Sequence, residues 1–162
     1  GSVLYLHGLG VLDGGTVCVH CIHVSPEEAR ILADTGTKVC LCPGSNRYLR
    51  VGTAPVGMYL AQNILPALGT DSTASNPELS LWREMRLLRE EHPGIDPEKV
   101  FAMATLGGAM TLGLAEHYGS LTPGRSGNML AVPVTEKCDS PAQLYDLLTR
   151  DNHHLKTAWV TD

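Results

Sequence analysis

Three short apolar segments, each followed by a helix with its own start signal, constrain the fold of this chain more than any other feature. The segments cover residues 17–22 (VCVHCI), 38–42 (KVCLC) and 66–70 (PALGT). They lack the polar alternation of a half-exposed strand, so both faces of each strand should be buried, as in a parallel sheet covered by helices. We therefore predict an α/β fold with three parallel strands joined by right-handed crossovers.

The helix after the first strand is predicted from its capping residues. In residues 25–36, Ser25 is a natural N-cap, and Glu28 completes a capping box with it. Pro26 suits the first helical position, and Gly36 stands where a C′ glycine ends a helix. Two further helices are expected at residues 54–65 and 76–92.

The later part of the chain predicts shorter elements. The helix at residues 76–92 should contain Pro77 in its first turn. Asp96 is the expected N-cap of the next helical stretch, which Gly107 and Gly108 should break into two short helices where another backbone approaches closely. The remaining predicted elements are a turn at 122–124, a strand at 128–134, a helix at 140–151 and a last strand at 155–162.

Composition and charge argue against several kinds of partner. A chain of 162 residues is long enough for one domain with a real core. Its net charge of −5, with acids and bases interspersed, argues against a nucleic-acid surface, and no basic run suggests a membrane face. No apolar run is long enough to span a bilayer. Because no signal peptide opens the chain, its five cysteines are most simply reduced thiols, and we expect a cytoplasmic protein.

Two polar residues at the ends of predicted strands are candidate catalytic residues. Asp71 follows the third strand, where a carboxylate in an enzyme barrel binds a metal or carries a proton, although it could equally cap its own loop. His20 lies near the end of the first strand, and taken alone it is more often a core histidine bonded to a carbonyl. Because strand side chains alternate, Cys18 should share a face with His20, and Cys21 should lie on the other.

The two candidates should come together at one edge of the sheet. Parallel strands place all their carboxyl ends at the same edge, where ligand chemistry collects. One strand should lie between those that carry His20 and Asp71, so their backbones should be on the order of 10 Å apart. Their side chains could then approach one water molecule from two sides.

The cysteines offer a competing site. Structural zinc is held by Cys/His quartets, usually from loop knuckles. Strand alternation would divide the ligands here between opposite faces of the sheet, so buried thiols that act as small hydrophobic groups are the favoured interpretation. The residues concerned are Cys18, His20, Cys21, His23, Cys40 and Cys42.

Several motifs together resemble the amidohydrolase superfamily. They are the His-Cys-x-His strand at His20, the Cys-Pro-x-Ser-Asn turn at Cys42 and the Gly-Thr-Asp-Ser loop at Gly69, followed by LWREMR, ATLGGAMTLGL and GSLTPGRSGNMLAV. The sequence is most similar to the aminohydrolase branch, which includes S-adenosylhomocysteine/methylthioadenosine deaminases, guanine and cytosine deaminases and triazine chlorohydrolases. The similarity runs through nearly the whole chain.

This resemblance implies a fold and a chemistry. The strands would be the sixth, seventh and eighth of a (β/α)8 TIM-type barrel, with residues 1–120 as a partial barrel and residues 121–162 as a tail that returns to a small β-sandwich. His20 would hydrogen-bond the metal-bound water and the substrate, and Asp71 would touch the metal and take a proton from that water. The implied metal is zinc, with iron as an alternative. The implied reaction is hydrolytic deamination, or dechlorination, of a purine, pyrimidine or related nitrogen heterocycle.

The chain departs from the family pattern in its metal ligands. It contains no His-x-His pair, and the His-x-x-Glu of the fifth strand is absent. We therefore expect a C-terminal fragment that begins after strand five, is inactive alone, and associates with itself or with the missing N-terminal part. The open edges of its sheet should be covered by another chain or by the tail. The alternative is a non-catalytic partial barrel that acts in assembly.

Overall fold

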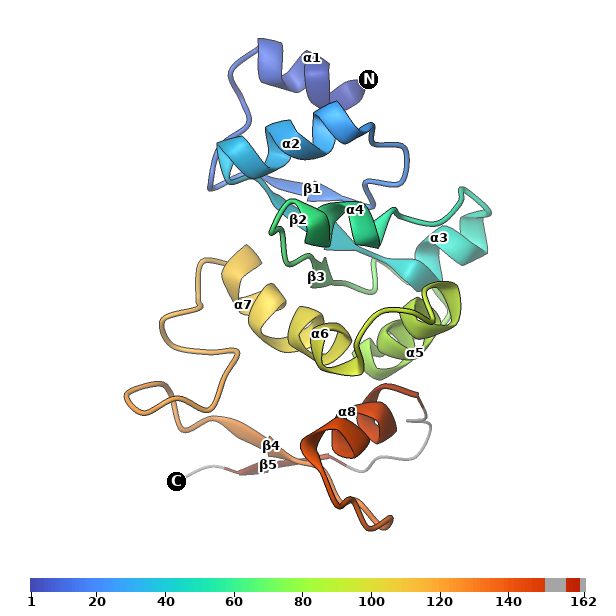
Figure 1. The fold of residues 1–162 in the computed structure, drawn as a ribbon, viewed down its shortest axis with the longest axis vertical. Helices are drawn as coiled ribbons and strands as arrows, with labels where there is room; N and C mark the ends of the chain where they lie inside the picture. The colour runs from blue at the N-terminus through green and yellow to red at the C-terminus, as the bar shows by residue number, and fades with distance from the viewer. Residues whose placement is uncertain (151–156, 161–162) are drawn as a thin grey trace.

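The computed structural model describes residues 1–150 and 157–160, and the chain runs from one end of the molecule to the other (Figure 1). The strands are β1 (Val17–Val19), β2 (Lys38–Leu41), β3 (Ala67–Leu68), β4 (Met129–Ala131) and β5 (Ala158–Val160). The helices are α1 (Ser2–Gly8), α2 (Pro26–Thr35), α3 (Pro43–Leu49), α4 (Val56–Ala61), α5 (Leu81–Glu91), α6 (Pro97–Ala102), the π-helical η1 (Met103–Gly107), α7 (Gly108–Thr111) and α8 (Pro141–Arg150). None of the described helices is both long and apolar enough to cross a membrane.

The first three strands form one parallel sheet in the order β1-β2-β3, which confirms the predicted topology. Cys18 lies opposite Val39 in this sheet. The first strand is shorter than predicted, because His20 and Cys21 take left-handed backbone angles, with φ of 66° and 45°. The regular alternation of side chains therefore stops at Val19, and the prediction that Cys18 and His20 share a strand face is wrong.

The predicted capping box of α2 is confirmed. The Ser25 hydroxyl accepts a hydrogen bond from the Glu28 amide at 3.2 Å, and the Glu28 carboxylate accepts one from the Ser25 amide at 3.0 Å. The same carboxylate also accepts the amides of Val3 and Leu4, at 3.2 and 3.3 Å. These amides begin α1, a helix that the sequence did not predict, so one buried carboxylate serves the amino ends of two helices.

Two helix starts differ from the prediction. No helix was predicted directly after the second strand, yet Pro43 opens α3, because proline is tolerated at the first helical position. The next long helix, α5, begins at Leu81 rather than near Pro77. Ser80 is its N-cap, with its hydroxyl accepting the Arg83 amide at 3.3 Å.

The stretch from α6 to α7 follows one continuous helical path, so the expected break at the glycine pair is wrong. Asp96 caps α6 as predicted, accepting the Glu98 amide at 2.9 Å. The π-helical η1 takes the place of a break. The expected close approach is confirmed at Gly107, where a Cβ atom would lie 2.6 Å from the carbonyl oxygen of Pro66.

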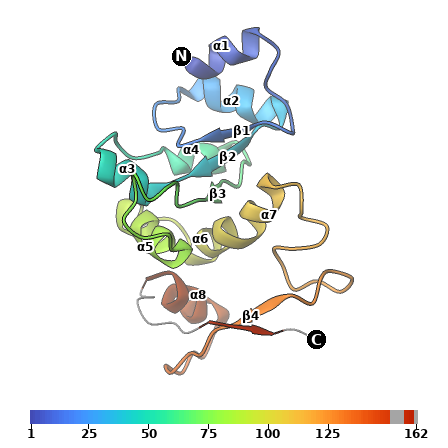
Figure 2. The same cartoon turned by 180° about the vertical axis from the view of Figure 1, so that it is seen from behind.

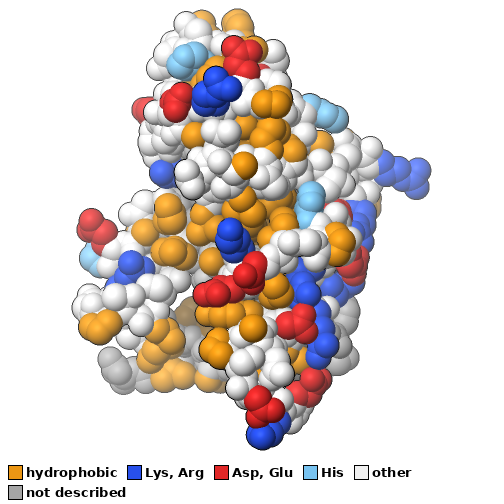
Figure 3. All heavy atoms as spheres, in the orientation of Figure 1, with side chains coloured by type: hydrophobic (Ala, Val, Ile, Leu, Met, Phe, Trp, Pro, Cys, Tyr) orange, Lys and Arg blue, Asp and Glu red, His pale blue; other side chains and the backbone are white. Residues whose placement is uncertain are grey.

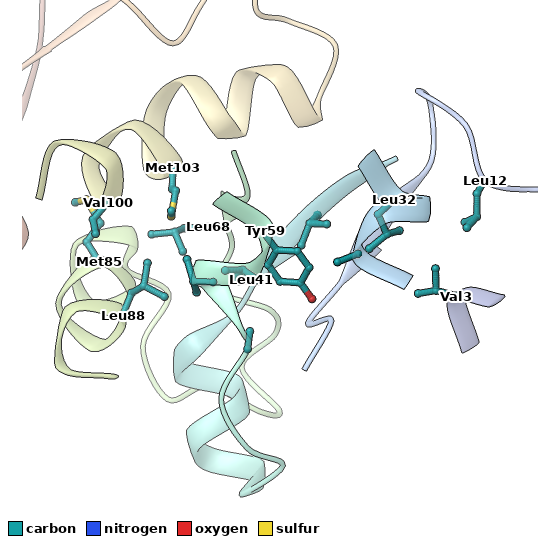
Figure 4. Close-up of a cluster of buried hydrophobic side chains, with 14 residues drawn as sticks. Val3, Leu12, Leu32, Leu41, Tyr59, Leu68, Met85, Leu88, Val100 and Met103 are labelled. Atoms are coloured by element: carbon teal, nitrogen blue, oxygen red, sulfur yellow. The ribbon is translucent and has the colours of Figure 1, made fainter. Parts of the chain in front are cut away.

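The main core lies on one face of the sheet (Figure 4). Tyr59 of α4 lies between Leu32 of α2 and Leu41 of β2. The opposite face is not covered in the same way: Val17 and Val19 are 39% and 50% exposed. The predicted burial of β1 on both faces is therefore wrong, because this edge strand packs only one face on helices. Apolar side chains are also visible on the molecular surface near the sheet and α7 (Figure 3).

The C-terminal part forms its own small sheet. β4 and β5 pair with each other in antiparallel fashion and do not extend the three-stranded sheet (Figure 2). Helix α8 packs on α5 and α6, with the rings of Phe101 and Tyr145 5.5 Å apart and an Arg89–Asp146 ion pair of 2.8 Å. The predicted strand at 155–162 lies partly outside the described residues, and the division of the chain at residue 120 stays a prediction.

Candidate active site

Two strands of the sheet end just before a polar residue with an unusual backbone. His20 directly follows β1, and its amide donates to the carbonyl of Cys40 at 2.8 Å. Asp71 follows β3 after Gly69 and Thr70. Both residues have positive φ, 66° for His20 and 58° for Asp71. Residues other than glycine rarely take this backbone conformation, and such strain clusters at functional sites.

The two side chains meet at the carboxyl edge of the sheet, as the sequence predicted. The Nε2 atom of His20 is 3.7 Å from Oδ2 of Asp71, and the side chains are 36% and 31% exposed. This distance is too long for a direct hydrogen bond, so a third group can bond to both atoms. The pair is therefore accessible to a small molecule from solvent.

Three donors hold the Asp71 carboxylate. Oδ2 accepts the hydroxyls of Ser45 and Ser75, each at 2.8 Å, and Oδ1 accepts the Ser72 amide at 2.8 Å. The hydrogen bonds from Ser45, Ser75 and Ser72, in that order, lower the pKa of Asp71 below its ordinary value. The carboxylate is thus ionised at neutral pH. Asp71 also organises its own loop through Ser72 and Ser75, as the capping interpretation of this residue expected.

A buried amide orients His20. Nδ1 of His20 is 2.9 Å from Oδ1 of Asn46, whose side chain is buried. When that oxygen accepts, the hydrogen of a neutral imidazole is on Nδ1. The lone pair of Nε2 is then directed toward the space beside Asp71. His20 is therefore held by a specific side chain, rather than only by a backbone carbonyl as the core interpretation expected.

Three side chains that orient the pair were not identified as functional from the sequence: Ser45, Asn46 and Ser75. Ser45 and Asn46 are adjacent in the first turn of α3, and Ser75 lies in the loop after Asp71. All three are buried polar residues. Their signal in the sequence is the run of small polar residues directly after two apolar strands.

The cysteines near the sheet are free thiols in the described structure. Burial raises the pKa of Cys21 to about 12, so its thiol is neutral. Desolvation likewise raises the pKa of Cys18. These two residues fit the interpretation of cysteines as small hydrophobic groups.

The described residues do not by themselves fit a catalytic metal ion. Among residues 1–150 and 157–160, no group of three or more His, Cys, Asp or Glu side chains is arranged to hold one. A catalytic zinc ion takes about three protein ligands. The His20–Asp71 pair provides one carboxylate and one imidazole, which is fewer than that number.

The sequence matches the model of the amidohydrolase family over residues 2–157. A 5-methylthioadenosine/S-adenosylhomocysteine deaminase from Teredinibacter turnerae is 33% identical over 96% of this chain and 37% of its own length. An S-triazine hydrolase from Gordonia rubripertincta is 33% identical over 85% of this chain and 30% of its own length. The chain thus spans about a third of these relatives.

Solved structures show the same similarity. An adenosine deaminase from Xanthomonas campestris with bound zinc superposes with a TM-score of 0.81 and 26% identity, covering 88% of this chain and 35% of that protein. Guanine deaminase from E. coli superposes with a TM-score of 0.73 and 26% identity, covering 89% of this chain and 35% of that one. The mixed α/β fold is therefore that of a known group of hydrolases, and it is consistent with a partial barrel.

Proposed function

The chain belongs to the amidohydrolase family, and we propose that it forms the part of a metal-dependent aminohydrolase that carries His20 and Asp71. The proposed reaction is hydrolytic deamination, or dechlorination, of a purine, pyrimidine or related nitrogen heterocycle. The names of the relatives support this class of substrate. The observation that carries the proposal is the His20–Asp71 pair, 3.7 Å apart at the carboxyl edge of a parallel sheet.

The contacts of the pair suit a reaction with water. Asp71 is held ionised by Ser45, Ser75 and Ser72, so its carboxylate can accept a proton from an attacking water molecule. His20 presents Nε2 to the same space, because Asn46 occupies Nδ1. Nε2 can therefore accept a hydrogen bond from the water and fix its position. The water oxygen bonds to the reacting carbon of the heterocycle as Asp71 takes one of its protons. In deamination that proton passes to the amine, and the carbon–nitrogen bond breaks to release ammonia; in dechlorination the carbon–chlorine bond breaks and chloride leaves.

We further propose how this chain fits into the complete enzyme. Strands β1, β2 and β3 would be strands six to eight of the barrel, with residues 1–120 in the barrel and residues 121–162 returning to a small β-sandwich. Asp71 would supply one oxygen ligand to a zinc or iron ion, which in a complete site would polarise the attacking water. The remaining ligands would come from polypeptide outside this chain, by association with the preceding part of the barrel.

A chimaeric enzyme tests the proposal. This chain would replace the aligned segment of the Teredinibacter turnerae deaminase, and ammonia release would be measured with adenosine-type and guanine-type substrates, alongside zinc content. We expect zinc binding and turnover in the chimaera. Asp71→Asn should reduce turnover by at least ~10²-fold, which is the usual contribution of a positioned proton acceptor.

Two outcomes would contradict the proposal. One is a folded, zinc-loaded chimaera in which Asp71→Asn leaves turnover unchanged. The other is robust zinc-dependent deamination by the 162-residue chain alone, since its two polar side chains are fewer than the roughly three protein ligands of a catalytic zinc ion. We expect the isolated chain to show no deaminase activity.

A further inference from the structure

A fully buried carboxylate lies behind the His20–Asp71 pair. The side chain of Glu84, in α5, is 0% exposed. Its Oε2 accepts the Gly44 amide at 2.6 Å, and its Oε1 accepts Nδ2 of Asn76 at 2.9 Å. Nη1 of Arg83 is 3.6 Å from Oε1. Burying a carboxylate is costly, and a hydrophobic residue of similar volume could fill the same space. The carboxylate therefore indicates that its specific hydrogen bonds are required at this position.

One set of hydrogen bonds runs from Glu84 to the first turn of α3. Gly44 is the second residue of that helix, and Ser45 and Asn46 follow it. Ser45 donates to Asp71 at 2.8 Å, and Asn46 bonds to His20 at 2.9 Å. A bond that fixes the Gly44 amide therefore fixes the turn that orients both members of the pair.

The approach of Glu84 to this turn depends on glycine. A Cβ atom at position 44 would overlap the Glu84 carboxylate, and it would lie 2.6 Å from Nη1 of Arg83 and 2.7 Å from Nδ2 of Asn76. The side chains of Glu84, Asn76 and Arg83 thus pack directly against the Gly44 backbone and leave no room for a Cβ atom.

The second set of hydrogen bonds runs from Glu84 to the loop that carries Asp71. Asn76 is 1% exposed, and its Nδ2 donates both to Glu84 and to the carbonyl of Thr70, the latter at 2.7 Å. Thr70 directly precedes Asp71. The Oδ1 atom of Asn76 accepts Nη1 of Arg83 at 2.7 Å, so both ends of the amide have partners and its orientation is fixed.

We propose that Glu84 is a positioning residue of this site, acting through Gly44 and Asn76 to hold the two segments that place His20 and Asp71. It touches neither side chain of the pair, so its effect on them passes through α3 and through the loop at Thr70. The inference uses the proposed function only for what the pair does. The hydrogen bonds through which Glu84 acts are independent of any activity.

Nuclear magnetic resonance of the 162-residue chain at one fixed pH tests this role. Glu84→Gln keeps the shape of the side chain but leaves one acceptor oxygen, so it cannot accept from both Gly44 and Asn76. We expect hydrogen exchange of the Gly44 amide to become at least ~10-fold faster, because its bond to the carboxylate is weakened. The ring-nitrogen shifts of His20 should also move toward those of mixed tautomers as Asn46 loosens.

Glu90→Gln is the matched control. It removes a carboxylate from the same helix and breaks ion pairs with Arg86 and Arg47, the second of which also belongs to α3. It has no contact with Gly44 or Asn76 among the hydrogen bonds of the described residues. The signals of Gly44 and His20 should therefore match those of the unmodified chain.

The amide spectrum of β1 and β2 shows whether the Glu84→Gln chain is folded. If it is folded and the Gly44 and His20 signals are unchanged, the proposal is overturned. If that variant does not fold, Arg83→Gln is the second test, because it removes the hydrogen bond to Asn76 and the 3.6 Å ion pair with Glu84 but leaves the bond between Glu84 and the Gly44 amide. Shifted amide signals at residues 70–72, with the Gly44 signal in place, support the positioning role. Unchanged signals at residues 70–72 overturn it. These results do not depend on deamination, so failure of the chimaeric enzyme would leave them standing.

Discussion

The Nε2 atom of His20 lies 3.7 Å from Oδ2 of Asp71, although β2 separates the strands that carry the two residues. The sheet alone does not determine this distance. Two adjacent buried residues also determine the distance, because Asn46 bonds to His20 and Ser45 bonds to Asp71. One turn of α3 therefore sets both members of the pair, and a shift of that turn would move them together.

The first prediction concerns the pH dependence of stability. Hydrogen bonds from Ser45, Ser75 and Ser72 lower the pKa of Asp71 in the folded chain. A lowered pKa contributes stability that is present above the unfolded value of ~3.9 and is lost as the pH falls through the folded pKa. Urea unfolding should therefore show the unmodified chain more stable than Asp71→Asn at neutral pH. The difference should shrink below about pH 4, and a constant difference down to pH 3 would contradict the assigned hydrogen bonds.

The second prediction concerns turnover in the chimaeric enzyme. His20→Asn should lower kcat by roughly 10²- to 10⁴-fold, the range expected for a side chain that acts directly in proton transfer and orientation. Asp34→Asn, which removes an exposed carboxylate from α2, is the control and should leave kcat unchanged. Steady-state ammonia release checks both variants. Equal rates for His20→Asn and Asp34→Asn would remove His20 from the mechanism.

Local signals in the sequence predicted the elements that depend on local chemistry. Helix α2 follows from Ser25 and Glu28, whose capping box involves only neighbouring residues. Helix α3 was missed, because Pro43-Gly44 is typical both of a strand stop and of a helix start. Its position depends on distant contacts, among them the bond between Gly44 and Glu84. Such a contact leaves no periodic pattern in the sequence.

The sequence likewise predicted the His20–Asp71 pair of the candidate site but not the residues that orient it. The meeting of His20 and Asp71 follows from the rule that parallel strands share a carboxyl edge. Asn46, which orients His20, and Ser45, which orients Asp71, lie on the missed helix α3, so they were missed with it. The expected burial of Val17 and Val19 was wrong, because their apolar character does not reveal which faces of the sheet helices cover.

The third prediction concerns the open edge of the sheet. Within the described residues, β1 pairs only with β2, and Val19 is 50% exposed. An apolar edge strand pairs readily with another chain, so we expect the isolated chain to self-associate with rising concentration. Sedimentation equilibrium should show weaker association for Val19→Lys. Val11→Lys, at an equally exposed valine outside the strands, is the control and should associate as the unmodified chain does. A monomer at every concentration would contradict the prediction.

The last prediction compares two adjacent glycines on the helical path from α6 to α7. A Cβ atom at Gly107 would lie 2.6 Å from the carbonyl oxygen of Pro66, the residue just before β3. Gly107→Ala should therefore push η1 away from the sheet and lower the free energy of unfolding by about 1–3 kcal/mol, as for other overpacked sites. A Cβ atom at Gly108 would meet nothing within 4 Å. Gly108→Ala should instead raise stability by about 0.5–1 kcal/mol, since alanine is the better helix former.

Urea unfolding of both variants, under the same conditions as the unmodified chain, measures these opposite effects. The two substitutions add the same methyl group to neighbouring helical positions, so differences in helix propensity largely cancel between them. The remaining difference in stability comes from the contact between position 107 and Pro66, the residue just before the strand that leads to Asp71. Equal stability of the two variants would show that η1 yields freely at this contact. A lower stability for Gly107→Ala would show that the approach of η1 to β3 is rigid.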